Sequence, residues 1–242
     1  MEREIALAGC VNFRDVGGYA ADGGTVRWRR LFRSDALHEL TPGDVARLRE
    51  LELATVIDLR SDFERGHDGE GVHPLAELGV RFVHAPIINA LNGEIMSDTS
   101  LTLAQRYAKI LERGGQALAE TVASIAESPG TSVFHCAAGK DRTGMVSAVV
   151  LGALGVPDAD VVADYAMTGR NLVAINARLR NHPAYLSTYA FVPKDAMTAD
   201  ADTMQGLIET LRERHGSMAG LLEHVGIGPE TLARLRRNLV AD

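Results

Sequence analysis

The fold class of this chain follows from one stretch, Thr131-Ser132-Val133-Phe134-His135-Cys136-Ala137-Ala138-Gly139-Lys140-Asp141-Arg142-Thr143-Gly144. Its first five residues, which include the β-branched Thr131 and Val133 and the aromatic Phe134, are predicted to form a strand. The loop Cys136 to Lys140 contains a glycine, and a helix rich in Val, Ala and Leu is expected from Asp141 onward. Strand, loop and helix in this order form the repeating unit of parallel α/β sheets.

The same alternation of strands and helices is found upstream of this stretch. Thr41-Pro42-Gly43-Asp44 combines an N-cap, a proline at the first helical position and an early acid, so a helix is expected to about Leu51. Strands are predicted at Ala54 to Leu59, Val80 to His84 and, after two Gly-rich turns, Val26 to Phe32. The prediction is an α/β fold with a mostly parallel sheet flanked by helices.

The rest of the chain is predicted to be helical. Leu101 to Glu127 should form one long helix or two, interrupted near Gly114-Gly115. Beyond Pro157 almost no strand is indicated, and the loop Asn181 to Lys194 separates predicted helices at Asp158 to Met167, Gly169 to Arg180, Asp200 to His215, Ser217 to Val225 and Pro229 to Val240. We expect a single domain, 1–242, in which 157–215 forms a helical lid or insertion over the active edge.

Composition excludes several classes of protein. A chain of 242 residues with 46% hydrophobic and 24% charged residues is neither disordered nor fibrous, and its length suits one domain. The net charge of −7 repels nucleic acid, so an anionic ligand needs a local positive site. No apolar run is long enough for an integral membrane segment, and the N-terminus lacks a signal-peptide core, so a cytoplasmic location is the default.

The loop after the predicted strand is suited to holding a phosphate against a thiolate. Cys136 follows the strand, Arg142 comes six positions later, and the loop leads into a helix N-terminus. Backbone N–H groups and the helix dipole bind tetrahedral anions in such loops, and the same field favours the thiolate form of Cys136. Arg142 can grip two phosphate oxygens at once, and Gly139 eases the tight turn.

These residues also carry a resemblance. Cys-x-x-x-x-x-Arg followed by Thr is similar to the motif of cysteine-dependent protein-tyrosine phosphatases, and the whole string His135 to Gly144 resembles that of their atypical bacterial branch. Further similar stretches are Asn12 to Tyr19, Leu31 to Ser34, Val56 to Ser61, Ala163 to Tyr165, His215 to Ser217 and Gly226 to Ile227. The resemblance spans most of the chain, although Ile88 to Ser100 and Asn181 to Ala201 have no match.

The resemblance implies a protein-tyrosine-phosphatase-like fold and a reaction through a cysteinyl-phosphate intermediate. Cys136 would attack phosphorus, Arg142 would bind the phosphoryl group in both steps, and the Thr143 hydroxyl would stabilise the departing thiolate. No cofactor is implied, and inorganic phosphate would be the product. The remaining phosphate-binding positions would be Ala137, Ala138, Gly139 and Lys140.

The general acid has two candidates. The resemblance assigns it to Asp141 inside the phosphate loop, although an acid at that position also suits a helix N-terminus without any catalytic role. Asp58 is the competitor, because it ends a predicted parallel strand, where α/β sheets place their ligands. A carboxylic acid must protonate the leaving oxygen, and proton transfer of this kind contributes roughly 10²–10⁴ in rate.

Several substrate classes fit these residues. The added cation Lys140 suits substrates with extra phosphates, so phosphotyrosine, phosphoserine or phosphothreonine, and phosphoinositides are the expected substrates of this dual-specificity enzyme. One alternative is a phosphatase of a small phosphorylated metabolite, and another is a phosphate-binding module that has lost catalysis. In the family that the chain resembles, members can be secreted without a signal peptide.

Four further expectations concern supporting and unpaired residues. His135 is expected to be structural and to hydrogen-bond beneath the loop, whereas Arg14 is expected either to serve its Gly-rich turn or to reach the active site. Cys10 is expected to be an inert small hydrophobe, with a redox partnership to Cys136 as the alternative. The histidines are scattered singly without metal-ligand spacing, so no metal site is expected.

Overall fold

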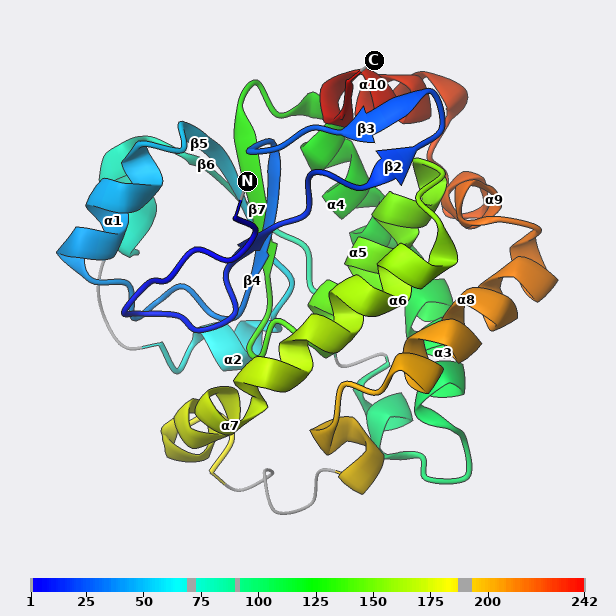
Figure 1. The fold of residues 1–242 in the computed structure, drawn as a ribbon. Coiled ribbons are helices and arrows are strands. Elements are labelled where there is room, and N and C mark those ends of the chain that lie inside the picture. Colours follow the sequence, from blue (N-terminus) through cyan, green and yellow to red (C-terminus); the bar gives the residue numbers. More distant parts are fainter. Residues whose placement is uncertain (1, 69–72, 90–91, 187–192, 242) are drawn as a thin grey trace.

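The computed structural model describes residues 2–68, 73–89, 92–186 and 193–241, and it is built around a five-stranded sheet (Figure 1). The strand order is β1-β4-β7-β5-β6, and every neighbouring pair is parallel except β1 with β4. The predicted, mostly parallel sheet is therefore confirmed. The strands are β1 (Arg14–Asp15), β4 (Leu31–Ser34), β5 (Leu53–Asp58), β6 (Arg81–His84) and β7 (Thr131–His135).

Helices cover both faces of this sheet, as Figure 1 shows with α1 on one side and α4 and α5 on the other. The smaller layer holds α1 (Pro42–Arg49) and the short 3₁₀ turn η1 (Pro74–Leu78). The larger layer holds α3 (Leu103–Arg113), α4 (Gly115–Glu127), α5 (Asp141–Ala153), α6 (Asp158–Ala166), α8 (Ala201–His215), α9 (Met218–His224) and α10 (Pro229–Leu239). The four-residue α2 (Asp62–Arg65) and α7 (Leu172–Asn181) lie at the carboxyl edge of the sheet, beside the residues that follow β7.

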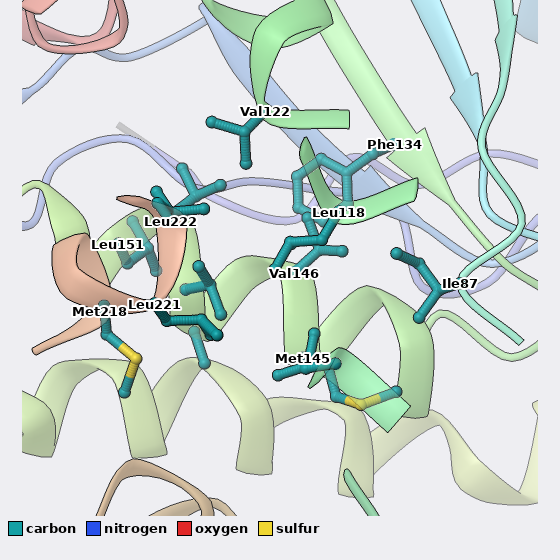
Figure 2. Packing of buried hydrophobic residues seen from close by; sticks show 14 of the residues in the cluster. Ile87, Leu118, Val122, Phe134, Met145, Val146, Leu151, Met218, Leu221 and Leu222 are labelled. Atoms are coloured by element: carbon teal, nitrogen blue, oxygen red, sulfur yellow. The ribbon is translucent and has the colours of Figure 1, made fainter. Parts of the chain in front are cut away.

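Strand β7 is buried on both faces because successive side chains point to opposite layers. Val133 packs with the α1 layer, whereas Phe134 belongs to the larger core on the other face. Figure 2 shows Phe134 in that larger core with Leu118 and Val146 from two helices. The apolar side chains Val133 and Phe134 thus each pack against a helical layer, one on either side of the sheet.

The predicted strand Val26 to Phe32 is wrong in its extent. The chain forms β3 (Gly24–Val26), then a turn in which Arg29 has a φ of 60°, and then β4. The two strands belong to different sheets, because β3 pairs with β2 (Ala20–Ala21) and with β8 (Val240–Ala241) in a small antiparallel sheet. The last helix was predicted to reach Val240, but that residue pairs with Val26 instead.

Leu101 to Glu127 forms two helices, α3 and α4, which meet at Gly114. A β-carbon at Gly114 would lie 2.9 Å from the carbonyl oxygens of both Ile110 and Ile87, so the bend brings the backbone close to a neighbouring segment. The C-terminal third is helical as predicted, with the 3₁₀ turns η3 (Met167–Asn171) and η5 (Lys194–Met197) between helices. The predicted loop Asn181 to Lys194 lies partly outside the described residues. None of the described helices has the length and apolar character needed to span a bilayer.

Candidate active site

The predicted phosphate loop, Cys136 to Arg142, joins β7 to α5 at the carboxyl edge of the sheet. Gly139 has a φ of +64°, which disfavours residues with a β-carbon. A β-carbon there would also lie 2.6 Å from the backbone nitrogen of Asp35 and 2.7 Å from the carbonyl of Ser34. Glycine is therefore required for both the turn and the close approach of the loop to the segment after β4.

Cys136 lies at the base of this loop and is 1% exposed. The Thr143 hydroxyl, in the first turn of α5, donates a hydrogen bond to the Cys136 sulfur at 3.1 Å. Such a bond stabilises negative charge on sulfur, and the N-terminus of α5 adds the positive end of its dipole. The structure thus brings Cys136 and Thr143 together as the motif predicts.

Two side chains from the N-terminal part of the chain hold the loop from behind. The Asn12 amide nitrogen donates to the carbonyl oxygens of Ala138 at 3.1 Å and Gly139 at 3.2 Å. Arg33, at the end of β4, donates to the same Gly139 carbonyl at 2.9 Å. Because C=O and N–H point in opposite directions across a peptide plane, these bonds turn the loop amides towards the other side.

A buried charge cluster supports these two tethers. Asp164 of α6 pairs with Arg14 at 3.3 Å and forms a second ion pair with Arg33. Arg14 also donates to the Asn12 side chain at 2.6 Å, so it acts on the loop through Asn12 and does not reach the cavity directly. Burial alone would raise the pKa of Asp164, but the two guanidinium groups lower it to about 2. Asp164 is therefore ionised and forms ion pairs with both buried guanidinium groups.

Arg142 has a carboxylate partner that lies far from it in the sequence and that its motif does not contain. Its two terminal nitrogens donate to Glu64 at 2.5 and 2.7 Å, and the Tyr185 hydroxyl donates to the same carboxylate at 2.6 Å. Burial would raise the pKa of Glu64, but Arg142 and Tyr185 lower it to about 2. A bidentate pair of this kind fixes the plane of the guanidinium group before any phosphate binds.

Asp141 opens α5 and lies at the same cavity as Cys136. Its Oδ1 accepts a hydrogen bond from the Tyr107 hydroxyl and lies 3.0 Å from the Lys140 ammonium nitrogen. Tyr107 also lies 3.1 Å from the Tyr165 hydroxyl. Both contacts of Asp141 involve one carboxylate oxygen, so its side chain is oriented while 21% of it stays exposed.

Lys140 does not take the position expected of a substrate-binding cation. Its ammonium group donates to the carbonyl oxygens of Ala196 at 2.6 Å and Thr198 at 2.8 Å, and it contacts Asp141. An ammonium group has three donors, so these contacts use all of them. In this conformation Lys140 ties the phosphate loop to η5, and the prediction that it faces extra phosphates is not what the structure shows.

Asp58 and His135 lie on a different cavity, of about 650 Å³. Arg60 holds Asp58 through both carboxylate oxygens, at 3.0 and 2.8 Å. Burial opposes ionisation of Asp58, but His135 and Arg60 lower its pKa well below the usual range. Asp58 is in register with His135 on the neighbouring strand, and their side chains lie on one face of the sheet, away from the Cys136 cavity.

The expected hydrogen bonds of His135 beneath the loop are wrong. Neither ring nitrogen has a hydrogen-bond partner among the described residues, and Nε2 lies 3.8 Å from the Asp58 carboxylate. Burial lowers the pKa of His135 to about 4, so the ring is neutral near pH 7. The ring lines the larger cavity, whereas the next residue, Cys136, lines the other one, because successive side chains at a strand end point in opposite directions.

The cavity over the loop has a volume of about 350 Å³. Its floor is formed by Glu64 and by loop residues on both sides of Gly139: Cys136, Ala137, Ala138, Lys140, Asp141 and Arg142. Its walls are largely apolar and come from segments on both sides of the loop: Ile88, Met96, Leu172, Ile175, Leu179, Tyr185, Ala196 and Met197. A ligand with an anionic end and an apolar body fits this division of floor and walls.

Two expectations outside the loop have different outcomes. Cys10 is buried and free, and burial raises the pKa of its thiol, which is the state expected of an inert thiol. In contrast, the histidines are not all isolated. His38, Asp68 and His182 offer ligand atoms within 4.8 Å of one another, the one such group among the described residues. Their separation in the sequence hid this cluster.

Comparison with known proteins gives one consistent family. The chain matches the tyrosine phosphatase family over residues 5–241. It is 29% identical to the triple specificity protein phosphatase PtpB of Mycobacterium tuberculosis, covering 95% of this chain and 96% of PtpB. A protein of Cupriavidus necator assigned to the tyrosine-protein phosphatases is 35% identical, covering 72% and 66% of the two chains. A tyrosine-protein phosphatase of Nostoc commune is 26% identical, covering 86% and 73%.

Proposed function

This chain belongs to the tyrosine phosphatase family, and from that premise we propose that it hydrolyses phosphomonoesters with Cys136 as nucleophile and Arg142 as phosphate ligand. The observation that carries this proposal is the 3.1 Å hydrogen bond from Thr143 to the Cys136 sulfur, at the floor of a cavity that Arg142 also lines. A buried cysteine without a chemical role would need neither a hydroxyl donor nor an adjacent guanidinium group.

The proposed reaction has two steps. The Cys136 thiolate attacks phosphorus, the bond to the leaving oxygen breaks, and that oxygen takes a proton from the general acid. Water then attacks the cysteinyl phosphate and releases inorganic phosphate, while Thr143 stabilises the thiolate that leaves. Glu64 occupies two donors of Arg142, and the guanidinium group has five, so donors remain for phosphate oxygens in both steps.

We assign the general acid to Asp141 rather than Asp58. Asp141 lines the same cavity as Cys136, and Tyr107 and Lys140 orient it through Oδ1, which leaves Oδ2 to carry the proton. Asp58 lines the other cavity, and its lowered pKa keeps it ionised near neutral pH. An ionised carboxylate has no proton to donate, so Asp58 is assigned the structural task of holding Arg60.

The cavity walls favour an aryl phosphate. A phosphotyrosine side chain would place its ring between the apolar residues of η5 and α7 and its phosphate on the loop. A phosphorylated sugar would leave its hydroxyl groups against apolar walls without partners. Phosphoserine, phosphothreonine and phosphoinositides stay within the proposed range, and the last of these requires Lys140 to release the carbonyls that it now binds.

We assign to the segment 157–215 the task of covering the site. Leu172, Ile175 and Leu179 of α7 and Met197 of η5 form much of the cavity wall, and Lys140 fastens η5 to the loop. This cover would shield a thiolate from solvent. A reducing compartment such as the cytoplasm suits the mechanism, because Cys136 must stay reduced to act and both cysteines are free thiols.

The test is hydrolysis of phenyl phosphate and of a phosphotyrosine peptide, with a phosphorylated sugar as comparison, in the presence of a chelator. We expect chelator-resistant turnover of both aryl substrates, complete loss in Cys136→Ser, and no significant turnover of the sugar. The matched control is Cys10→Ser, which removes the other thiol and should leave turnover unchanged. Turnover that survives in Cys136→Ser, or that a chelator abolishes, would contradict the thiolate mechanism.

A further inference from the structure

A second group of chemically active side chains lies away from the phosphate loop. His38 belongs to the segment between β4 and α1, Asp68 follows α2, and His182 is the residue at the C-terminal end of α7. The Nδ1 atom of His38 and the Nε2 atom of His182 each lie 3.5 Å from the same oxygen, Oδ1 of Asp68. All three ligand atoms lie within 4.8 Å of one another.

These separations fit a metal ion better than a hydrogen-bonded triad. Bonds of about 2.0–2.2 Å to nitrogen and oxygen in a tetrahedral site place ligand atoms about 3.4 Å apart. The observed 3.5 Å is close to that value and too long for a normal hydrogen bond. The Nδ1 atom of His38 is buried and has no hydrogen-bond partner among the described residues, so its lone pair is uncommitted.

Groups around the cluster orient its ligands as second-layer partners do in metal sites. Arg60 donates to Asp68 at 2.9 and 2.7 Å and so fixes the carboxylate, while its charge is offset by Asp58. The Nε2 atom of His38 lies 3.9 Å from a carboxylate oxygen of Glu39, which is too long for a hydrogen bond, so Glu39 is an acidic neighbour of the ring and does not fix it.

His182 needs one rearrangement. Its Nδ1 accepts a hydrogen bond from the Ala184 amide at 3.2 Å, so the proton of the neutral ring is on Nε2 in this conformation. Coordination through Nε2 moves that proton to Nδ1 and gives up the bond to Ala184. The ring loses no net proton, and the hydrogen bond that it gives up lies just beyond the C-terminal end of a helix.

We propose that His38, Asp68 and His182 bind one divalent transition-metal ion of the zinc type, through Nδ1, Oδ1 and Nε2 respectively, with water in the fourth position. The three ligands come from three separate segments, so the ion would fasten the C-terminal end of α7 to the edge of the sheet. Since α7 forms part of the cavity wall, the ion would fix the cover of the active site without entering the reaction.

The first test measures binding and needs no substrate. The full chain is stripped with a chelator, transferred to chelator-free buffer and titrated with Zn²⁺ by calorimetry, and then with Co²⁺ while its visible absorption is recorded. We expect one ion per chain and an intense tetrahedral Co²⁺ spectrum. In His38→Ala and in His182→Ala the affinity should fall beyond the roughly 10–100-fold that loss of an outer partner causes. Circular dichroism checks that both variants are folded.

The matched control is His224→Ala, which removes an exposed histidine outside the cluster. Its affinity should equal that of the wild type. The proposal is overturned if the wild type takes up no ion, if the two cluster variants bind as tightly as the wild type, or if His224→Ala weakens binding as much as they do.

A second measurement tests the fastening of α7. Addition of Zn²⁺ should slow amide hydrogen exchange across α7 in the wild type and leave it unchanged in His38→Ala, whose substitution lies outside that helix. Equal protection in both proteins, or no protection in the wild type, would show that the ion does not join α7 to the sheet edge.

Discussion

Gly139→Ala tests how the phosphate loop obtains its shape. The loop passes so close to the segment after β4 that a β-carbon would lie 2.6 Å from the Asp35 nitrogen and 2.7 Å from the Ser34 carbonyl. These are backbone atoms, which cannot rotate away as a flexible side chain can. The φ of +64° adds a conformational penalty that is independent of the contact.

Other glycines separate the two effects. Gly79 has nearly the same φ, +67°, but open space where the β-carbon would be, and Gly169 has open space and no positive φ. Gly79→Ala should destabilise by about 1–2 kcal/mol from φ alone. Gly169→Ala should stay within about 0.5 kcal/mol of the wild type. Gly139→Ala has the same φ penalty and adds overpacking of about 1–3 kcal/mol. Its free energy of unfolding should therefore be about 2–5 kcal/mol below that of the wild type.

Urea unfolding followed by circular dichroism gives the three free energies of unfolding, and phenyl phosphate hydrolysis gives kcat/KM. In Gly139→Ala the loop must move away from Asp35, and a misplacement near 1 Å reduces the rate by roughly 10²-fold. The two control variants should keep wild-type kcat/KM. If Gly139→Ala matched Gly79→Ala in stability and the wild type in kcat/KM, the close approach would not shape the loop.

Three further predictions concern buried or site carboxylates. The ionised Glu64 side chain contributes to the free energy of unfolding, because its folded pKa is about 2, below its ordinary 4.5. This contribution is present above pH 4.5 and is lost as the pH falls towards 2. From pH 5 to pH 2 the free energy of unfolding of the wild type should fall by about 3 kcal/mol more than that of Glu64→Gln, and equal losses would refute this. Asp141→Asn should lower kcat roughly 10²–10⁴-fold on an alkyl phosphate, but far less on an aryl phosphate whose acidic phenol leaves without a proton. Asp58→Asn should not show this difference between the two substrates. If Asp58→Asn showed the difference and Asp141→Asn did not, Asp58 would be the general acid. Asp164→Asn leaves two buried cations unpaired and should destabilise the folded protein by about 3–5 kcal/mol, measured by thermal unfolding. The control Asp62→Asn, whose side chain is 89% exposed, should change the stability very little. Similar melting temperatures for the two variants would count against a stabilising role of the charge cluster.

Local sequence predicted the elements whose environment is uniform along the chain. The strand Leu53–Asp58 packs against both helical layers, so its short, β-branched and apolar run could be recognised without knowledge of its neighbours. The stretch Val26 to Phe32 is also predicted as one strand, yet it divides between two sheets at Arg29. The partner that completes this division is Val240, at the other end of the chain, and no local pattern contains that information.

The same distinction applies to Lys140 and His135. Their positions in the motif indicated that both lie at the phosphate loop, and both do. What each side chain contacts was not predicted: Lys140 binds carbonyls 56 and 58 residues later in the chain, and His135 faces a second cavity. Sequence spacing determines where a backbone atom lies relative to its neighbours in the chain. The partner that a long side chain contacts depends on which other segments pack beside it.

The sequence by itself determined the chemistry of this protein: a thiol, a guanidinium and a hydroxyl spaced within one loop, Cys136 to Thr143, between a strand and a helix. Such spacing is set by covalent geometry over a few residues. Only the tertiary structure decided that Glu64, 78 residues before Arg142, orients its guanidinium group, and that Asn12 tethers a loop 126 residues away. These contacts depend on how the layers pack, because side chains that are distant in sequence meet only where burial of the common core brings their backbones together.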